Sequence, residues 1–374
     1  MKIGIVTEYF FPTLGGITEN IHHFSRELLR RGHDFRIITG FRGEPAEIDP
    51  EIRHRMIFVG RNIPVFFNKS CGRLTVGTGL SRRVRDILRA QRFDIIHTHS
   101  PMFPTLPVIA NMQTDAPIVG TFHTCTSGEL IYYKLYRKKL RTYLERMTGR
   151  IAVSECCAQE NERAFDVSFD IIPNGVDTEW WSKGAEKIRK FDDGRINILF
   201  LGRPDKRNGL DTLIRAFARV HRTNPRTRLI VVGDGPLAFH FKRLVPADIR
   251  DDVSFEGSAS KARRDYAASA HVFCFLPSIA SFGVTILEGM SAGKAIIASD
   301  IEAFRALVTH GRSALLVPPQ DEDALASAIS KLADDAVLRE RLGGTAAADA
   351  ARYDWKRVAD RQLAYYEQIL KCSR

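Results

Sequence analysis

The sequence predicts an α/β protein in which two doubly wound domains are each built on a parallel β-sheet. Short apolar runs alternate with helical patterns from end to end, which is typical of parallel sheets. The length of 374 residues exceeds the roughly 250–300 residues at which single cores stop growing. A polar, loop-forming stretch at Trp180–Arg195 divides the chain near its middle. We therefore predict one domain over residues 1–182 and a second over residues 183–352.

Each predicted strand is a short run of apolar residues. In the first half the predicted strands are Lys2–Thr7, Phe35–Thr39, Met56–Val59, Asp94–His97, Ile118–Phe122 and Ile151–Val153. In the second half they are Ile196–Gly202, Arg228–Val232, Val253–Phe255, Val272–Leu276, Ala295–Ala298 and Ala314–Val317. Ligands of doubly wound sheets bind beyond the carboxyl ends of the strands, so we expect a site there, in a cleft between the domains. The C-terminal segment 353–374 has a helical pattern and is expected to pack back on the first domain.

The composition is that of a soluble globular protein, with 44% hydrophobic and 26% charged residues. No apolar run approaches the roughly 18–20 residues that a membrane-spanning helix needs. The segment Met1–Val6 resembles a first strand more than a signal peptide. The six cysteines show no metal-type spacing and are expected to be free thiols. These observations predict a cytoplasmic protein.

The positive charge is concentrated in one part of the chain. The net charge is +11, and residues 61–150 hold 15 Lys and Arg against 5 Asp and Glu. Such a surface attracts phosphate-rich partners. Nucleic-acid binding is disfavoured because helix-turn-helix, zinc-finger and aromatic-basic sheet motifs are absent. A predicted helix at Ile131–Met147 has Tyr and Leu on one face and basic side chains beside it, namely Lys134, Arg137, Lys138 and Arg141. It is a contact with an anionic membrane, an ordinary helix that packs its Tyr and Leu face on the sheet, or both.

The segment Pro277–Glu288 predicts a strand end, a turn and the N-terminus of a helix. The first amides of a helix lack backbone partners and carry partial positive charge, so they suit a diphosphate. The residues expected to present them are Phe282, Gly283, Val284 and Thr285. Glu288 lies further along the helix, where a carboxylate accepts hydrogen bonds from a ribose. An ordinary buried helix start is the alternative.

A basic loop follows the predicted strand that ends at Gly202. Arg203, Lys206 and Arg207 are placed to clamp a diphosphate and to stabilise negative charge on a leaving group. A solvated loop is the alternative. Further on, Val231–Pro236 contains Gly233 but lacks the third glycine of a dinucleotide fingerprint. We interpret it as a turn that lines a nucleotide pocket and not as an NAD site.

Two further features belong to the predicted first domain. Gly15 and Gly16 follow the first strand, and paired glycines let a backbone approach a phosphate, although a plain turn explains them too. His123 ends a strand, where it either contacts a sugar hydroxyl or serves a structural role. In the second half, Asp321 and Asp323 have acid-x-acid spacing, but acids at a helix N-terminus are a sufficient explanation. We expect neither a metal nor another cofactor.

Together these segments resemble the retaining GT-B glycosyltransferases of family 4. In the first domain the resemblance rests on Gly15–Gly16, G-T-F-H-T at Gly120–Thr124, G-R-I-A-V-S at Gly149–Ser154 and I-P-N-G-V-D at Ile172–Asp177. In the second it rests on F-L-G-R at Phe200–Arg203, V-G-D-G at Val232–Gly235, S-F-G-V at Ser281–Val284, L-E-G-M at Leu287–Met290, A-S-D at Ala298–Asp300 and Y-D-W at Tyr353–Trp355. The set covers almost the whole chain in order.

The resemblance implies transfer of a sugar from a nucleotide diphosphate donor with retained anomeric configuration. It implies that the second domain binds the donor and that His123 contacts the sugar and the incoming hydroxyl, with Arg203 and Lys206 completing the catalytic set. Two positions depart from the family. Ala280 stands where the family usually has a glutamate that touches the sugar, and Asn208 stands where it usually has a lysine.

We expect a membrane lipid or lipid-linked acceptor, because residues 61–150 are basic, and peripheral binding at the inner face of the plasma membrane. The resemblance favours mannose, carried by GDP-mannose. Two other functions remain open from the sequence. One is a non-catalytic subunit that binds nucleotide or lipid and partners an active transferase, which the departures at Ala280 and Asn208 suggest. The other is a sugar-nucleotide epimerase.

Overall fold

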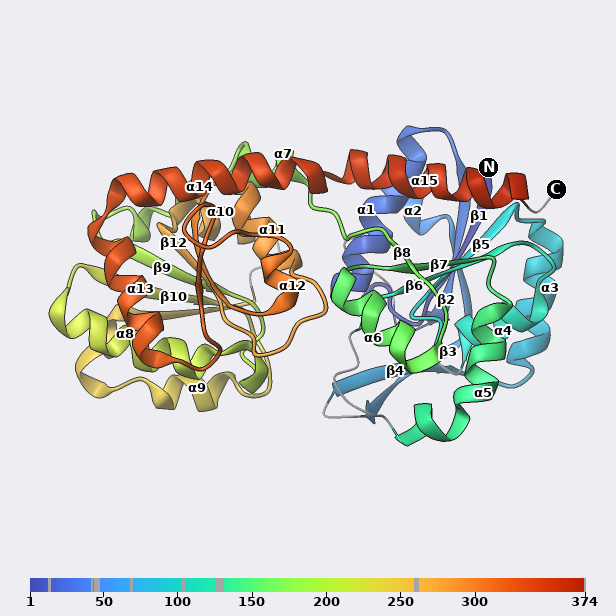
Figure 1. The fold of residues 1–374 in the computed structure, drawn as a ribbon, viewed down its shortest axis with the longest axis horizontal. Coiled ribbons are helices and arrows are strands. Elements are labelled where there is room, and N and C mark those ends of the chain that lie inside the picture. The colour runs from blue at the N-terminus through green and yellow to red at the C-terminus, as the bar shows by residue number, and fades with distance from the viewer. Residues whose placement is uncertain are drawn as a thin grey trace. The chain divides into compact units, whose positions relative to one another are not determined.

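The computed structural model divides the chain into two compact units (Figure 1). It describes residues 1–12, 15–41, 43, 48–67, 70–102, 105–124, 131–258 and 262–372, without the side chains of 66–67, 70–71 and 131–137. Unit 1 comprises Met1–Asn174 and Trp355–Arg374, and unit 2 comprises Gly175–Asp354. Both ends of the chain, blue and red in Figure 1, therefore belong to unit 1.

Unit 1 is built on a sheet with the strand order β4-β3-β2-β1-β5-β6-β7-β8. Its elements are β1 (Lys2–Val6), α1 (Gly16–Arg30), β2 (Asp34–Phe41), α2 (Pro50–Arg53), β3 (Met56–Phe67), β4 (Ser70–Val76), α3 (Leu80–Gln91), β5 (Ile95–His99), α4 (Leu106–Gln113), β6 (Ile118–Phe122), α5 (Ile131–Glu145), β7 (Gly149–Ala152), α6 (Glu155–Phe165), β8 (Asp170–Ile171) and α15 (Trp355–Cys372). The strands pair in parallel except for β3 and β4, which are antiparallel.

Unit 2 is built on a parallel sheet with the strand order β11-β10-β9-β12-β13-β14. Its elements are α7 (Thr178–Ser182), η1 (Arg189–Phe191), β9 (Ile196–Leu201), η2 (Lys206–Asn208), α8 (Leu210–Thr223), β10 (Thr227–Val232), α9 (Ala238–Leu244), η3 (Ala247–Asp252), β11 (Val253–Gly257), α10 (Arg263–Ser269), β12 (Val272–Phe275), α11 (Val284–Ser291), β13 (Ala295–Ser299), α12 (Glu302–Arg305), β14 (Leu315–Val317), α13 (Glu322–Asp334), α14 (Ala336–Ala350) and η4 (Ala351–Tyr353). The labels η mark 3-10 helices.

Apolar periodicity explains why these segments fold as they do. In α8 the buried positions Leu210, Leu213, Phe217 and Val220 recur at helical spacing and pack on the sheet of unit 2. The central strands β1, β5 and β6 are almost wholly buried, as expected when helices cover both faces of a parallel sheet. The carboxyl ends of the strands in each sheet therefore meet at one edge, where loops carry the polar side chains.

The C-terminal helix α15 completes the core of unit 1. Figure 1 shows it in red beside α1, and the two helices are in contact. Trp355 at its start is buried, and its ring stacks on His23 with centroids 5.6 Å apart. Tyr366 is fully buried in the same core.

The border between the units differs from the predicted one. Residues 175–182 belong to unit 2, although we predicted that the first domain reaches residue 182. The reason is pairing: the amide of Val176 donates to the carbonyl of Tyr353 at 2.9 Å, and α7 packs on α11. Strand β4 was not predicted, because its residues Ser70–Val76 lack a continuous apolar run.

Candidate active site

The predicted helix N-terminus exists in unit 2 as the start of α11. Gly283 is its N-cap residue and, as a glycine, makes no side-chain cap hydrogen bond to the first amides. A Cβ on Gly283 would lie 2.9 Å from Leu307 Cδ1 and 3.1 Å from Phe304 Cε1, so close packing against α12 and the residues after it explains the glycine. Phe282 is buried, with its ring edge-on to Tyr353. The first-turn amides, including those of Val284 and Thr285, therefore have the free donors that an anion requires.

Glu288 lies on the same helix and is bound by an arginine that the sequence did not single out. Only 5% of Glu288 is exposed, and Nη2 of Arg263 donates to its Oε2 at 2.6 Å. The guanidinium of Arg263 lies 5.8 Å from the ring centroid of buried Trp181. A buried carboxylate needs such a partner because desolvation of an unpaired charge is costly. The pair keeps Glu288 oriented on the inner side of α11.

The basic loop after β9 is ordered by a carboxylate in its middle. Asp205 accepts from the amide of Arg207 at 3.1 Å. Its carboxylate also lies 3.7 Å from the guanidinium of Arg203 and 3.6 Å from that of Arg207. Lys206 is exposed in η2. The loop therefore holds its cations at the surface, where both arginine side chains are more than half exposed.

Asn208, one of the two departures from the family, has a structural contact of its own. Its Nδ2 donates to the backbone oxygen of Arg203 at 2.7 Å. The backbone oxygen of Arg207 accepts from the amide of Ser278 at 3.2 Å. The second bond joins the basic loop to the segment that leads into α11. The structure thus brings the predicted diphosphate residues of unit 2 together at one edge of the sheet.

Gly233 is required because the chain just after β10 passes close to the chain just after its parallel neighbour β9. Its φ is +144°, and an added Cβ would lie 1.9 Å from the oxygen of Gly202. Its amide donates to the oxygen of Gly257 at 2.8 Å, which ties the turn to the end of β11. The turn therefore lies at the same edge as the basic loop, as its position after a parallel strand predicts.

In unit 1, His123 follows β6 and is bound to another histidine. Its Nε2 lies 2.9 Å from Nδ1 of His99, the last residue of β5, and the two rings stack. Burial lowers the pKa of His123 to about 3 and holds that of His99 well below 6.5. Both rings are therefore neutral at pH 7. The sulfur of Cys157 lies 3.4 Å from the carbonyl oxygens of both Phe122 and Thr124, on either side of His123, and its single proton donates to one of them.

A third histidine, His97, lies behind this pair. It is fully buried, and its ring centroid is 4.3 Å from that of His99. Residues 97 and 99 share one face of β5 because side chains alternate along a strand. From the sequence we singled out His123 but not His97 or His99. The pattern His-Thr-His at the end of a buried strand is the signal that could have indicated the cluster.

Glu8, a buried carboxylate at the carboxyl end of β1, is another residue that the sequence analysis did not single out. It follows β1 and is 1% exposed. The amide of Leu106 donates to it at 2.8 Å, the hydroxyls of Thr75 and Thr105 also donate to it, and Nδ2 of Asn62 donates to its backbone oxygen at 2.9 Å. Burial raises the pKa of Glu8, and these hydrogen bonds oppose the rise. The residue joins β1, β3, β4 and α4, and so has a structural role.

Gly15 and Gly16 open α1, while Thr13 and Leu14 lie outside the described residues. No atom of the described residues lies within 4 Å of a Cβ added at Gly15, so packing does not explain this glycine.

Asp321 caps α13 by accepting from the amide of Ala324 at 2.9 Å, and Asp323 pairs with Arg219. These acids lie at a helix start, as we predicted. Within the described part of the chain, no group of three or more His, Cys, Asp or Glu is arranged to hold a metal ion.

The predicted basic helix exists as α5. The side chains of Lys134 and Arg137 lie outside the described residues, whereas Lys138 is exposed. Arg141 is bound by two acids, since its guanidinium lies 2.8 Å from Glu145 and 2.6 Å from Asp166. Its charge is therefore largely satisfied within unit 1.

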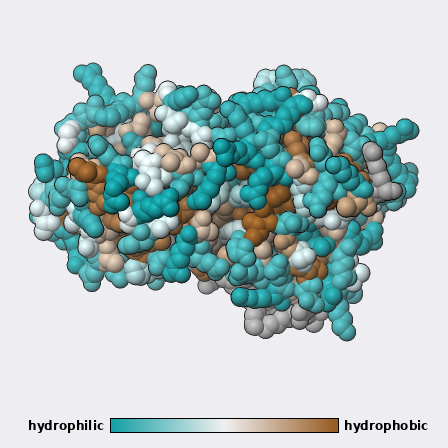
Figure 2. Space-filling model, turned by 45° about the horizontal axis from the view of Figure 1, so that its top comes forward, coloured by the Kyte–Doolittle hydropathy of each residue, from teal (hydrophilic) through white to brown (hydrophobic). Residues whose placement is uncertain are grey.

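Leu144 near the end of α5 and Met147 just after it are buried, as an ordinary packing face predicts, whereas the predicted face at Tyr132 and Tyr136 lies outside the described side chains. Among the described helices, none combines the length and the apolar character that a bilayer crossing needs. In Figure 2, hydrophilic side chains cover most of the face in view and leave apolar ones in small separate areas.

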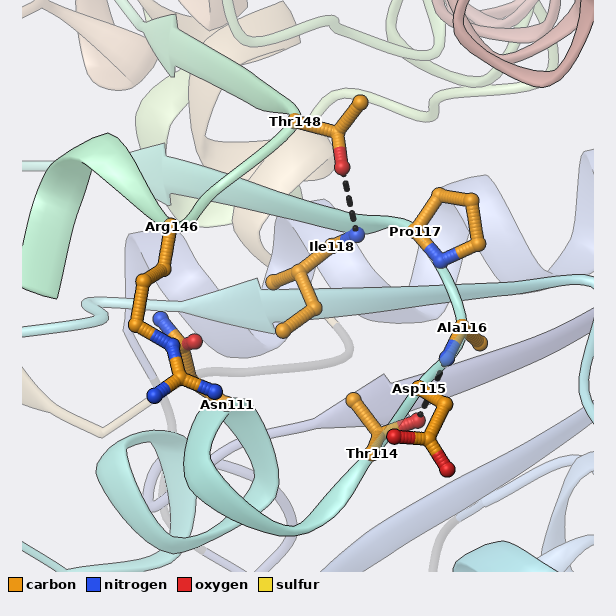
Figure 3. A pocket seen from close by; sticks show the side chains of 8 residues that line it. All are labelled: Asn111, Thr114, Asp115, Ala116, Pro117, Ile118, Arg146 and Thr148. Carbon is orange, nitrogen blue, oxygen red and sulfur yellow. Dashed lines mark hydrogen bonds between the residues drawn. The ribbon is translucent and has the colours of Figure 1, made fainter. Parts of the chain in front are cut away.

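A pocket of about 280 Å³ lies at the opposite end of β6 from His123. Figure 3 shows Arg146 on one side of it and Asp115 on another, and the amide of Ile118 donates to the hydroxyl oxygen of Thr148 at 3.3 Å. The remaining lining residues are Asn111, Thr114, Ala116 and Pro117. Because it opens at the amino ends of the strands, this pocket is separate from the predicted site residues of unit 1.

Comparison with known proteins places these features in a family. The profile described as "Glycosyltransferase Family 4" matches residues 14–180, and the profile described as "Glycosyl transferases group 1" matches residues 195–335. A phosphatidyl-myo-inositol mannosyltransferase of Mycobacterium leprae is 33% identical over 373 residues, covering 99% of this chain and 97% of the relative. A protein of the same name from Propionibacterium freudenreichii is 27% identical, with 98% and 94% covered.

Solved structures agree on the fold. A glycosyltransferase from Rickettsia africae superposes with a TM-score of 0.80 at 18% identity, covering 99% of each chain. The Anabaena protein HepE, solved in complex with UDP, superposes with a TM-score of 0.78 at 19% identity, covering 98% of this chain and 100% of that one. The chain therefore belongs to glycosyltransferase family 4, has the GT-B fold and is a glycosyltransferase.

Proposed function

We propose that this glycosyltransferase moves a mannosyl residue from a nucleotide diphosphate sugar, GDP-mannose by first choice, to a membrane lipid of the phosphatidylinositol type. The observation that carries the proposal is similarity over the full length to proteins named for that activity, at 33% identity with 99% of this chain covered. The proposal includes retention of anomeric configuration and independence from metal ions, as the sequence resemblance implies.

The donor nucleotide binds to unit 2 in this proposal. Glu288 accepts hydrogen bonds from the ribose, and the hydrogen bond from Arg263 orients its carboxylate. The amides at the start of α11 and the cations Arg203, Lys206 and Arg207 bind the diphosphate. Two features support this assignment: the N-cap glycine makes no side-chain cap hydrogen bond, and a backbone hydrogen bond joins the basic loop to the segment before α11.

Unit 1 binds the acceptor and supplies His123, which hydrogen-bonds to the transferred sugar and the incoming hydroxyl. Gly15 and Gly16 let the backbone at the start of α1 approach the phosphates, and the open space around Gly15 supports that role. Exposed basic residues such as Lys138 attract the anionic headgroups of the inner membrane face, where the protein binds peripherally.

The reaction exchanges one bond to the anomeric carbon for another. The bond from that carbon to the diphosphate oxygen breaks, and a bond to the acceptor hydroxyl oxygen forms on the same face. The departing diphosphate takes the acceptor proton, while Arg203 and Lys206 stabilise its negative charge. No pair of carboxylates serves this step, in contrast to retaining glycosidases.

The first test is transfer from radiolabelled GDP-mannose to phosphatidylinositol vesicles in the presence of a metal chelator, with the product linkage read by NMR. An α-linked mannosyl lipid is expected. Tight nucleotide binding without transfer would favour a non-catalytic subunit, and isomerisation of the sugar nucleotide without acceptor would favour an epimerase. A requirement for divalent metal would contradict the metal-independent mechanism.

The donor assignment has its own test in Arg203→Ala. Charged hydrogen bonds contribute about 1.5–3 kcal/mol, so we expect roughly 10- to 100-fold weaker calorimetric binding of GDP. Binding of the nucleoside without phosphates should stay unchanged. Arg215→Ala is the matched control, because Arg215 is bound by Glu322 and Asp211 on the α8–α13 side of the same unit. Equal losses in both variants would contradict a diphosphate role for Arg203.

A further inference from the structure

The protonation of His97 is fixed by its neighbours in α15. Nε2 of Gln362 lies 3.1 Å from Nδ1 of His97, and the hydroxyl of Tyr366 lies 2.5 Å from the same atom. An amide nitrogen only donates, so Nδ1 of His97 accepts. Its proton is therefore on Nε2, which donates to Oγ1 of Thr121 at 2.6 Å. All hydrogen-bonding groups of this ring are satisfied, so it cannot bond to His99.

His99 and His123 share a single hydrogen bond that can run in two directions. Either Nδ1–H of His99 donates to Nε2 of His123, or Nε2–H of His123 donates to Nδ1 of His99. Both rings are neutral near pH 7 because burial lowers their pKa values, so each carries one proton. The direction of the bond thus decides where the proton is on both rings.

The buried side of His99 distinguishes the two directions. Its Nε2 is fully buried, and no hydrogen-bond partner for it is present among the described residues. If His123 donated, the proton of His99 would be on that nitrogen and would have no acceptor. Buried donors without acceptors are rarer in proteins than buried acceptors without donors. The favoured arrangement keeps the proton of His99 on Nδ1.

We propose that His99 is a positioning residue that donates Nδ1–H to Nε2 of His123 and thereby leaves His123 with its own proton on Nδ1. Nδ1 of His123 makes no hydrogen bond to the described residues and is not among their fully buried atoms. It is therefore available as an N–H donor to a substrate oxygen. The proposal rests on the proposed function only for the statement that a substrate oxygen is the acceptor.

This arrangement has a mechanistic consequence. A ring that already carries its proton on Nδ1 cannot accept the acceptor proton at that atom while its Nε2 is occupied by His99. His123 then stabilises an oxygen of the sugar or of the incoming hydroxyl by donating to it, and the acceptor proton goes to the departing diphosphate. Helix α15 contributes indirectly, since Tyr366 and Gln362 hold His97 against the ring of His99.

The direct test uses wild-type protein labelled with 15N-histidine. NMR at pH 7 identifies the protonated nitrogen of each ring, and coupling across the N–H···N bond identifies the donor. We expect the bonding proton on Nδ1 of His99, with Nδ1 of His123 protonated and its Nε2 not. The signal lost in His123→Gln assigns that ring. A proton on Nε2 of His99 would overturn the proposal whatever the activity of the protein.

A matched pair of variants tests the role in transfer. His99→Asn keeps an N–H donor near the position of Nδ1, whereas His99→Leu has similar volume and no donor. We expect His99→Leu to lower kcat about 10- to 100-fold, the usual effect of removing a residue that orients another functional side chain. The KM for the nucleotide sugar should stay unchanged. His99→Asn should retain most of the wild-type kcat. Equal kcat values in the two variants would contradict the positioning role.

The two readouts separate this inference from the proposed function. If no sugar is transferred by wild-type protein but the NMR result is as expected, the proposed function fails and the tautomer assignment stands. If wild-type protein transfers mannose but His99 carries its proton on Nε2, the proposed function stands and the inference fails.

Discussion

Arg263 and Glu288 form a hydrogen-bonded ion pair at 2.6 Å on the inner side of α11. The carboxylate is nearly buried, whereas 29% of the arginine side chain is exposed. In the proposed function this pair prepares the ribose acceptor before nucleotide binds. Arg263 also lies next to Trp181 of α7, so the pair joins the start of unit 2 to its proposed donor site.

Removing Arg263 should therefore affect both stability and donor binding. We expect Arg263→Met to lower the free energy of unfolding by about 1–3 kcal/mol, because Glu288 loses a charged hydrogen bond in a buried position. Urea unfolding followed by circular dichroism measures the change. Arg264→Met is the control, since Arg264 lies over the exposed ring of Trp180. An equal loss of unfolding free energy in Arg264→Met would indicate that the Arg263–Glu288 ion pair does not itself stabilise the protein.

Gly233 should tolerate no side chain. We expect Gly233→Ala to lower the free energy of unfolding by about 2–4 kcal/mol and to abolish calorimetric GDP binding, since its Cβ would collide with the oxygen of Gly202. Gly235→Ala is a matched control two residues on, where the added Cβ comes closest to the flexible side chain of Arg203, at 3.0 Å, and no nearer than 3.5 Å to backbone. Similar stability in the two variants would show that the backbone after β9 and β10 adjusts easily to the added side chain.

Stability should fall as pH falls from about 6.5 toward 4. Burial lowers the pKa of His97 and of His123 to about 3 each, below the ordinary value of 6.5. In this window the unfolded chain binds protons that the folded chain does not, so acidification favours unfolding. Each such histidine contributes up to about 1.4 kcal/mol per pH unit.

Urea unfolding at several pH values between 7 and 5 measures this slope. His97→Gln should reduce the slope by up to one proton, although the variant itself is less stable. Stability that is constant or rises on acidification would contradict neutral buried histidines.

Binding to anionic vesicles should depend on lysines more than on Arg141. Lys138 and Lys139 are exposed, and each cation near such a surface contributes about 1 kcal/mol. We expect Lys138→Ala with Lys139→Ala to weaken sedimentation with phosphatidylserine vesicles at low salt. Arg141→Ala is the control, because Glu145 and Asp166 already bind that guanidinium. Undiminished binding to neutral vesicles in high salt would contradict an electrostatic contact.

Much of the architecture could be predicted because it depends on local pattern. The apolar runs at Ile118–Phe122 and Ile196–Leu201 predict buried strands, and Pro277–Glu288 predicts a helix start with an acid beyond it. Strand β4 and the partners of Glu8 could not be predicted. Antiparallel pairing with β3 and hydrogen bonds across nearly a hundred residues leave no mark on local hydrophobicity.

The sequence by itself determined the fold class and the family, since these follow from hydrophobic period, turn residues and ordered motifs, and it predicted which loops bind the donor. Only the tertiary structure decided that Arg263 binds Glu288, that Arg141 is already paired and that His99 bonds to His123. The physical reason is that burial and hydrogen bonding between distant segments, not residue type, set the charge and proton position of a side chain.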